Sequence, residues 1–379
     1  MLSLMLDLMT ATGTPHPKPA GIARALRWFG PSALMALGVF FTGRLLMEPL
    51  RPLPRFDEEG MDPFSVVETY QLRERSEPFE IGVFGSSVSI WGVLPEVIAE
   101  ELDVPENSVR KLAVQGGTPF DMWQLLQRNP EKFEKMRTAV VEINPRMLDD
   151  DQEGGRMSVT VAQHASLDER ELLTRKVDRW KQRGDLVLPI LSVRRPVKDA
   201  MLDVLNTPHL ASVHPHPDRR LTPHGPGWHV EDEDPVNHLF VDSVTADKAA
   251  RRIMGNWHLS RLHHDALKKS LAWFKDHGVI AICHQMPVHP DVASHLKTDE
   301  KVARGYAAYN AFVKSLDLPE GTFLQPLSCL DCGIPVHGMR DHTHLNRLGA
   351  TIYSEMLAGL IENTGSGSSN RGNGKSGAF

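Results

Sequence analysis

Two segments far apart in the chain hold the residues that could carry out chemistry together. Ser87 ends the block Gly85-Ser86-Ser87, directly after the apolar run 81–84. Near the other end, Asp341 and His344 lie three residues apart, so one turn of chain can bring the carboxylate to the imidazole. A carboxylate that orients a histidine, and a histidine that takes the proton of a serine hydroxyl, suit nucleophilic acyl transfer. Each segment alone also fits a structural role, as a helix cap or a surface pair.

The elements around these residues predict an α/β fold. Apolar runs with the length of buried strands lie at 81–84, 109–114, 139–143, 279–283 and 322–324. Helical patterns lie between and after them, from Pro95, at 119–127, at 246–277 with a break near Gly255, at 299–315 and at 346–361. This alternation predicts a mainly parallel five-stranded sheet with helices on both faces, a three-layer α/β/α arrangement. Ligands of such sheets bind at the carboxyl ends of the strands, where Ser87 is expected.

One long segment departs from this alternation. Residues 147–256 contain helical patterns near 168–183 and 193–205 and then a polar region rich in histidine and proline, so we interpret them as an insertion. The histidines at 209, 214, 216, 224, 229 and 238 could bind a metal, but their irregular spacing favours a solvated loop. Cys329 and Cys332 have the spacing of a metal or redox pair, yet no second pair of ligands follows them. Two thiols or a local disulfide remain open, and we expect no metal or cofactor.

The N-terminal region predicts a membrane anchor. Residues 29–43 are uncharged and mostly apolar, and the run continues past Arg44, so we expect an anchor helix over 28–50 after a tail at 1–27. The run is shorter than the roughly 20 residues that span a bilayer, so Arg44 must snorkel or the helix must begin near Ile22. An amphipathic or buried helix is the alternative. Basic residues balance on the two sides and leave the orientation open.

Three further segments complete the predicted organisation. Residues 51–78 begin with a stretch rich in proline and charge and are expected to be a linker. Residues 79–363 are expected to form one domain that includes the insertion. Residues 364–379 lack apolar content and are predicted to be disordered.

Composition narrows the class of partner. Hydrophobic residues make up 41% and charged residues 24% of the 379, which is typical of a folded globular protein. The net charge of -6 gives no concentrated positive surface for phosphates, so we expect no nucleic-acid partner.

The two chemical segments together resemble the SGNH (GDSL-like) hydrolase family. In that family a serine in the first strand-to-helix loop is served by a DxxH motif just before the last helix, and the fold is flavodoxin-like. The resemblance covers roughly residues 79–361 and implies Ser87 as nucleophile with Asp341 and His344 as its partners. The family's serine is third in a GDS block, so Ser86 stands where the family has aspartate.

The same resemblance implies an oxyanion hole. In the family it combines the nucleophile's own N–H, here that of Ser87, with a glycine N–H and an asparagine side chain. Gly116 or Gly117 matches the glycine block, and Asn144 matches the asparagine. Where the family usually shows GxND, this chain has Glu142 for glycine and Pro145 for aspartate. Asn144 has a turn role before proline as its alternative.

These departures, with the His-Leu-Asn ending at 344–346, resemble a membrane-anchored branch of the superfamily that acts in bacterial envelope polymer acylation. The resemblance implies a single-pass protein of the bacterial inner membrane with an extracytoplasmic catalytic domain. It implies an acylated carbohydrate or other ester as substrate, with a multi-spanning membrane O-acyltransferase as a candidate partner. The expected function is that of a serine esterase or O-acyltransferase. The alternative is a non-catalytic envelope scaffold or carbohydrate-binding protein, which the altered GxND block favours.

Overall fold

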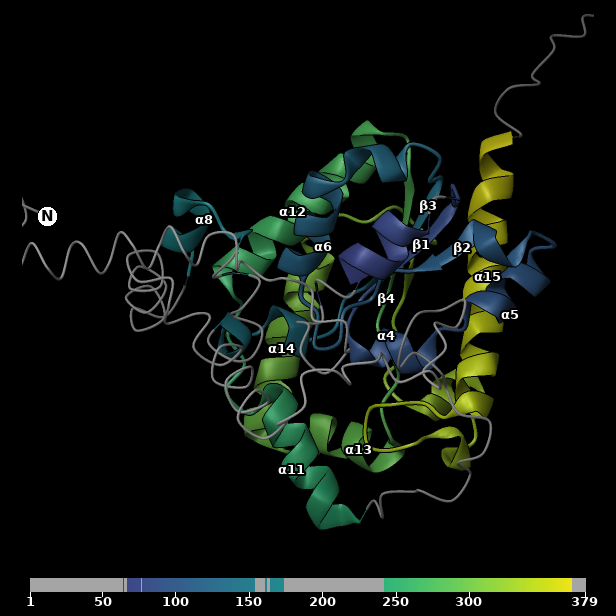
Figure 1. Ribbon diagram of the computed structural model, residues 1–379. Coiled ribbons are helices and arrows are strands. Elements are labelled where there is room, and N and C mark those ends of the chain that lie inside the picture. Colours follow the sequence, from purple (N-terminus) through teal and green to yellow (C-terminus); the bar gives the residue numbers. More distant parts are fainter. Residues whose placement is uncertain are drawn as a thin grey trace, which may run out of the picture.

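The computed structural model describes residues 64, 67–75, 77–153, 161, 164–173 and 242–369. At its centre lies a sheet of five parallel strands in the order β2-β1-β3-β4-β5 (Figure 1). The strands are β1 (Ile81–Phe84), β2 (Val109–Lys111), β3 (Thr138–Glu142), β4 (Ile280–His284) and β5 (Phe323–Leu324). The predicted parallel sheet is confirmed, and β2 ends three residues before the predicted 114.

Helices cover both faces of this sheet. They are α4 (Ser87–Gly92), α5 (Pro95–Glu101), α6 (Pro119–Arg128), α8 (Leu167–Glu171), α11 (Ser243–Met254), α12 (Arg261–Asp276), α13 (Pro290–Thr298), α14 (Glu300–Lys314) and α15 (Arg347–Ser369). Helices α5 and α15 lie on one side of the strands, and α6, α12 and α14 lie on the other (Figure 1). The α/β/α layering is therefore as predicted, and α11 and α12 confirm the break near Gly255.

Short helical turns connect these elements. They are the π-helix η1 (Val67–Glu74) and the 3-10 turns η2 (Glu106–Ser108), η3 (Pro130–Phe133), η4 (Arg146–Leu148), η5 (Asp150–Glu153), η6 (Cys329–Cys332) and η7 (Val336–Gly338).

Alternation along the strands divides the core into two layers. Val83 and Val140 face α5 and α15, and they pack in a cluster with buried residues of α15 such as Tyr353. Phe84 and Val141, one position further along each strand, face the opposite side and pack with residues of α6, α12 and α14. A side-chain period of two in buried parallel strands produces this division and explains why both strands read as continuous apolar runs.

The folded domain begins earlier than the predicted boundary at residue 79. Phe64, Val67 and Leu72, which belong to the predicted linker, are fully buried in the larger core cluster. The buried Arg110 side chain of β2 donates to the backbone oxygen of Gln71 at 2.9 Å, which ties η1 to the sheet edge. Apolar residues at helical spacing thus continue the domain into the linker.

The C-terminal helix is longer than predicted. Helix α15 continues to Ser369, past the predicted helix end at 361 and into the segment predicted to be disordered from Thr364. Backbone hydrogen bonds can extend a helix beyond its last packed residue, and the Thr364 hydroxyl donates to Leu360 O at 2.6 Å.

Two short helices were not predicted from the sequence. Helix α4 consists of Ser, Val, Ile, Trp and Gly, which are weak helix formers, and it depends on the cap at Ser86 and on burial of one face. Helix α13 begins at Pro290 after the cap His289.

Several predictions concern residues outside the described part of the chain. These are the anchor at 28–50, the helix at 193–205, the histidines between 209 and 238 and the tail beyond Ser369. Among the helices that the structure does describe, none is both long and apolar enough to cross a bilayer.

A hydrogen bond from the Tyr309 hydroxyl stabilises the end of β3, and its contribution to stability can be tested. It is buried on α14 and donates at 2.7 Å to Ile143 O, directly after the strand. We expect Tyr309→Phe to lower the free energy of unfolding by about 1 to 2 kcal/mol, because it leaves a buried carbonyl without its donor. Urea denaturation measures this change. An unchanged unfolding free energy at a normal circular dichroism spectrum would contradict the assigned role.

Candidate active site

Ser87 lies at the carboxyl end of β1, where the chain turns into α4. Ser86 caps the helix, since its Oγ accepts from Val88 N at 3.3 Å, and Ser87 is the first helical residue. Its backbone N–H therefore lies in the first helical turn, where it has no intrahelical acceptor. Gly85 must be glycine, because a Cβ there would come within 2.4 Å of both Glu142 Oε2 and Ser89 Oγ.

A hairpin-like loop before α15 presents the other two residues. Met339 and Leu345 form an antiparallel bridge, and Arg340 N donates to His344 O at 2.8 Å. Asn346 ends the loop by capping α15, with its Oδ1 accepting from Gly349 N at 3.2 Å.

The structure brings the three predicted catalytic residues together in a continuous chain of hydrogen bonds. His344 Nδ1 lies 2.7 Å from Asp341 Oδ2, and His344 Nε2 lies 3.2 Å from Ser87 Oγ. A carboxylate only accepts, so Nδ1 carries the proton and donates it to Asp341. Nε2 then faces the serine hydroxyl as an acceptor, which is the tautomer that a general base needs.

The second oxygen of Asp341 fixes the loop itself. Asp341 Oδ1 accepts from the backbone N–H groups of Thr343 and His344, both at 2.8 Å. Burial raises the pKa of this carboxyl, but the His344 hydrogen bond and charge, together with the two backbone donors, lower the pKa to about 2. Asp341 is therefore ionised and able to stabilise an imidazolium.

The hydrogen bonds distinguish between the two glycines of the predicted oxyanion hole. Gly117 N donates to Val114 O at 2.6 Å, and a Cβ at Gly117 would lie 2.6 Å from Gly85 O. Gly116 has a positive φ of 70°, and in the described part of the chain its N–H has no protein acceptor. Gly117 thus serves close packing against the nucleophile loop, and Gly116 has the N–H that is free for an oxyanion.

For Asn144, the structure shows the turn role and leaves the oxyanion role a prediction. Its Oδ1 accepts from Met147 N at 3.0 Å, which is a turn role after β3. Its Nδ2 donates one hydrogen bond to Glu142 Oε1. An amide nitrogen has two hydrogens, so one N–H remains for an oxyanion while the other holds the side chain in place.

Glu142 is a residue of this site that sequence reasoning missed as a participant. It is 1% exposed and accepts hydrogen bonds from the nucleophile loop as well as from Asn144. The available signal was its pairing with a second departure, since the chain lacks the family's acid at 86 and has an extra acid at 142.

A cation–π contact joins the nucleophile helix to the loop of the triad. The Arg340 guanidinium lies 3.8 Å from the centroid of the Trp91 ring. Trp91 is one helical turn after Ser87, and Arg340 directly precedes Asp341. The stack therefore contacts both halves of the site and helps to fix their separation.

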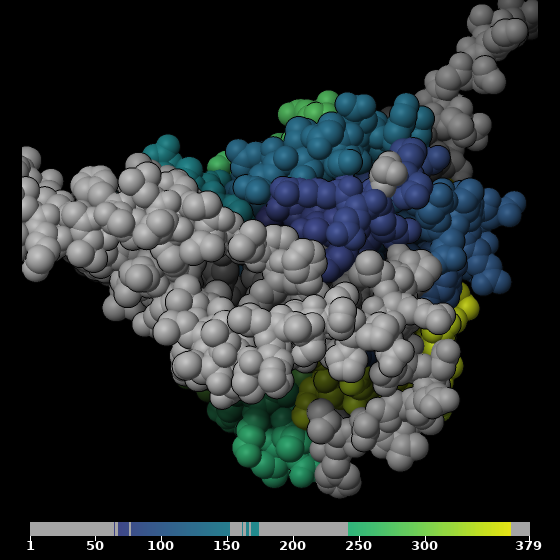
Figure 2. Space-filling model, viewed as in Figure 1, coloured from purple at the N-terminus to yellow at the C-terminus, as the bar shows by residue number. Residues whose placement is uncertain are grey.

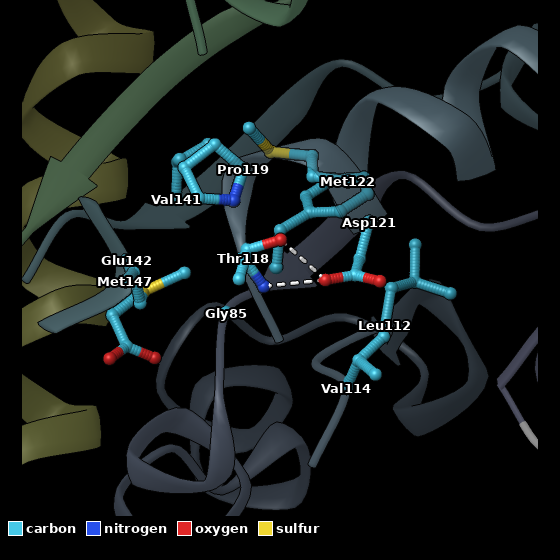
Figure 3. Close-up of a pocket in the computed structure, with 11 residues that line it drawn as sticks. Gly85, Leu112, Val114, Thr118, Pro119, Asp121, Met122, Val141, Glu142 and Met147 are labelled. Atoms are coloured by element: carbon cyan, nitrogen blue, oxygen red, sulfur yellow. Dashed lines mark hydrogen bonds between the residues drawn. The ribbon is translucent and has the colours of Figure 1, made fainter. Parts of the chain in front are cut away.

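A small pocket lies beside the nucleophile loop (Figure 3). Its wall is mostly apolar, with Leu112, Val114 and Met122, and Gly85 and Glu142 also line it. Ser87, Asp341 and His344 are not among its lining residues, so this pocket does not enclose the hydroxyl that would react.

Other residues that could do chemistry have structural positions. His263 and His284 are fully buried, and burial lowers the pKa of each to about 3, so both are neutral packing residues. Cys329 and Cys332 are buried free thiols rather than a disulfide. In the residues that the structure describes, no cluster of three or more His, Cys, Asp or Glu could hold a metal ion.

Comparison with protein-family models and with curated proteins gives no match for this chain. The case for its chemistry therefore depends on the geometry of Ser87, His344 and Asp341 and on the motif resemblance.

Asp341→Asn tests the orientation of His344. The amide nitrogen would donate to Nδ1 and move the ring proton to Nε2, where it could no longer accept from Ser87. We expect hydrolysis of 4-nitrophenyl acetate to fall by about 10³ to 10⁴-fold with folding preserved. Asp331→Asn is the matched control, since Asp331 also accepts from backbone N–H groups in a nearby turn, at 2.8 and 3.0 Å. Equal activities of the two variants would contradict the assignment.

The pKa of Asp341 also predicts a loss of stability in acid. Its folded value of about 2 is below the ordinary 3.8, so ionised Asp341 stabilises the fold above pH 4 and this contribution is lost as pH falls towards 2. The contribution is on the order of 2 kcal/mol. Urea denaturation between pH 5 and 2.5 should show a smaller pH dependence for Asp341→Asn than for the unaltered chain. Parallel curves would contradict it.

Proposed function

We propose that this protein is a serine esterase or O-acyltransferase of the SGNH type, with Ser87 as nucleophile, His344 as general base and Asp341 as the residue that orients it. One observation carries the proposal. The hydrogen bonds from Ser87 Oγ through His344 to Asp341 connect residues 257 positions apart in the chain, with the tautomer that proton abstraction requires.

The first half of the reaction forms an acyl-enzyme. The Ser87 hydroxyl gives its proton to His344 Nε2 while its oxygen attacks the ester carbonyl carbon. The tetrahedral oxyanion is held by the backbone N–H groups of Ser87 and Gly116 and by the second N–H of Asn144. When the intermediate collapses, the bond to the leaving oxygen breaks and His344 returns the proton to that oxygen.

The second half releases the acyl group. Water or a sugar hydroxyl gives a proton to His344 and attacks the acyl carbon, and Ser87 leaves with the proton restored to its oxygen. Water as acceptor gives an esterase, and a sugar hydroxyl gives a transferase. Asp341 stabilises the imidazolium in both halves, because its carboxylate lies 2.7 Å from Nδ1.

The fold supports the family assignment within this proposal. The strand order β2-β1-β3-β4-β5 is that of flavodoxin-like sheets, in which ligands bind at the carboxyl edge. Ser87 follows β1 and Asn144 follows β3 at this edge, and the triad loop precedes α15. The positions agree with the SGNH resemblance in chain order and in space.

The cellular setting is part of the same proposal. An anchor at 28–50 and the resemblance to envelope acylation proteins favour the bacterial inner membrane, with the catalytic domain on the extracytoplasmic side. An acylated envelope carbohydrate is the proposed substrate class, and a multi-spanning O-acyltransferase is the proposed partner.

Labelling with a fluorophosphonate tests the proposal directly. The full chain, purified in a mild detergent, should be labelled, because the probe reacts with a serine that a base has activated. Ser87→Ala should abolish labelling, whereas Ser108→Ala, a serine in η2 at the start of β2, should leave it unchanged.

Two outcomes would argue against this proposal. Equal labelling of the unaltered chain and Ser87→Ala would move the nucleophile elsewhere. No labelling of a folded chain, together with full cellular function of Ser87→Ala, would favour the non-catalytic scaffold or carbohydrate-binding protein.

A further inference from the structure

A buried carboxylate organises the nucleophile loop from the neighbouring strand. Glu142 is the last residue of β3 and is 1% exposed. Its Oε2 accepts from Ser86 N at 2.7 Å, Ser89 N at 3.2 Å and Ser89 Oγ at 2.7 Å. Its Oε1 accepts from Ser86 Oγ at 2.9 Å and from Asn144 Nδ2. One carboxylate thus joins the residue before the nucleophile to the asparagine of the oxyanion hole.

Every group that faces Glu142 in these bonds is a donor. Backbone N–H and amide N–H groups can only donate, and the Ser86 hydroxyl already accepts from Val88 N, so its proton is free for Glu142. Two carboxylate oxygens offer about four lone-pair sites, and five donors converge on them here, whereas an amide would oppose some of these donors with its own N–H groups.

We infer that Glu142 is a positioning residue for the reaction proposed above. It fixes the Ser86 and Ser89 backbone on either side of Ser87 and points the free N–H of Asn144 in one direction. It touches neither the substrate nor Ser87 Oγ, so it acts through these neighbours. The catalytic consequence of this inference rests on the proposed function. The hydrogen bonds of Glu142 are independent of that function.

The inference also accounts for the two departures from the family motif. The chain has Ser86 where the family has aspartate, and Glu142 where the family has glycine. The Ser86 Oγ lies 2.9 Å from Glu142 Oε1. Position 86 therefore lacks the family's carboxyl group, but residue 142, which contacts position 86, supplies one. The two departures are thus one relocation of a carboxylate, rather than two losses that would mark an inactive relative.

Glu142→Gln is the first test. An NH₂ group on the Oε2 side would face two backbone N–H groups that cannot turn away. On the Oε1 side the Ser86 hydroxyl could turn and accept, but Asn144 could not, so the Asn144 side chain is released. We expect kcat for 4-nitrophenyl acetate and the rate of fluorophosphonate labelling to fall by about 10²-fold, with KM little changed.

Glu68→Gln is the matched control. Glu68 is also a buried carboxylate and accepts from Arg128 Nε at 2.9 Å and Asn129 Nδ2 at 3.2 Å, away from the nucleophile loop. It should lower the melting temperature but leave kcat and labelling unchanged. Equal losses of kcat in both variants would mean that Glu142 has a general structural role, and would overturn the inference.

A second test moves the carboxylate from residue 142 to residue 86, where the family has aspartate. Ser86→Asp alone places two carboxylates in contact and should reduce labelling by more than 10²-fold and lower the melting temperature. Ser86→Asp with Glu142→Gly leaves one carboxylate at the same place, so labelling and melting temperature should recover above those of either single variant. Additive losses in the double variant would overturn the inference.

The two proposals fail in different ways. If the unaltered chain is not labelled and Ser87→Ala keeps full cellular function, the proposed function fails, and the recovery of melting temperature in the double variant still tests the relocation. If the chain is labelled and Glu142→Gln reacts at the unaltered rate, the proposed function stands and the role of Glu142 is refuted. A double-mutant cycle with Asn144→Ala adds a third readout. Glu142→Gln should lower kcat by a smaller factor in the Asn144→Ala variant than in the unaltered chain.

Discussion

The pairing of β1 with β3 is the constraint on which the site depends. Phe84 is opposite Val141 in the parallel register, so the two strands end side by side at the carboxyl edge. The block Gly85-Ser86-Ser87 therefore lies next to Glu142 and Asn144, and hydrogen bonds between them follow from the register. A slip of one residue in β1 would turn every side chain of the strand to the opposite face and separate these groups. The strand pairing thus builds half of the site before any side chain of the triad is placed.

The other half of the site lies on a small loop near the C-terminal end, from Met339 to Asn346. The Met339 to Leu345 bridge and the cap at Asn346 fix its two ends. Inside it, Asp341 holds backbone N–H groups with one oxygen and the His344 ring with the other, so the conformation of the loop and the tautomer of the base have a common cause. In Figure 2, green and yellow C-terminal segments lie below the purple and blue part of the described chain. In the reaction proposed above, these fixed ends and hydrogen bonds would hold His344 next to Ser87 before a substrate binds.

Much of this arrangement could be predicted from the sequence, and the rest depended on contacts between distant residues. Apolar runs bounded by glycine and proline located the strands because burial on both faces leaves a strong local signal. Ser87, Asp341 and His344 followed from motif type and chain order. The role of Glu142 did not, because a single glutamate within an apolar run gives no local sign of the groups that it contacts. Its partners become visible only when the register is known. The same applies to helix α4, whose weak helix formers are held by a cap and by packing.

The burial of Glu142 affects the free energy of the folded chain around the site. Removal of an ionised group from water costs several kcal/mol, and only a full set of donors offsets such a cost. Glu142 has that set, but all of its partners lie within a few residues of Ser87 or Asn144. Any movement of the Gly85-Ser86-Ser87 loop would therefore leave buried polar groups without hydrogen-bond partners, which costs free energy. Stability and geometry are coupled at this point. In the reaction proposed above, a buried glutamate here would give Ser87 a fixed position rather than a large gain in folding free energy. The need for glycine at 85 reflects the same close packing.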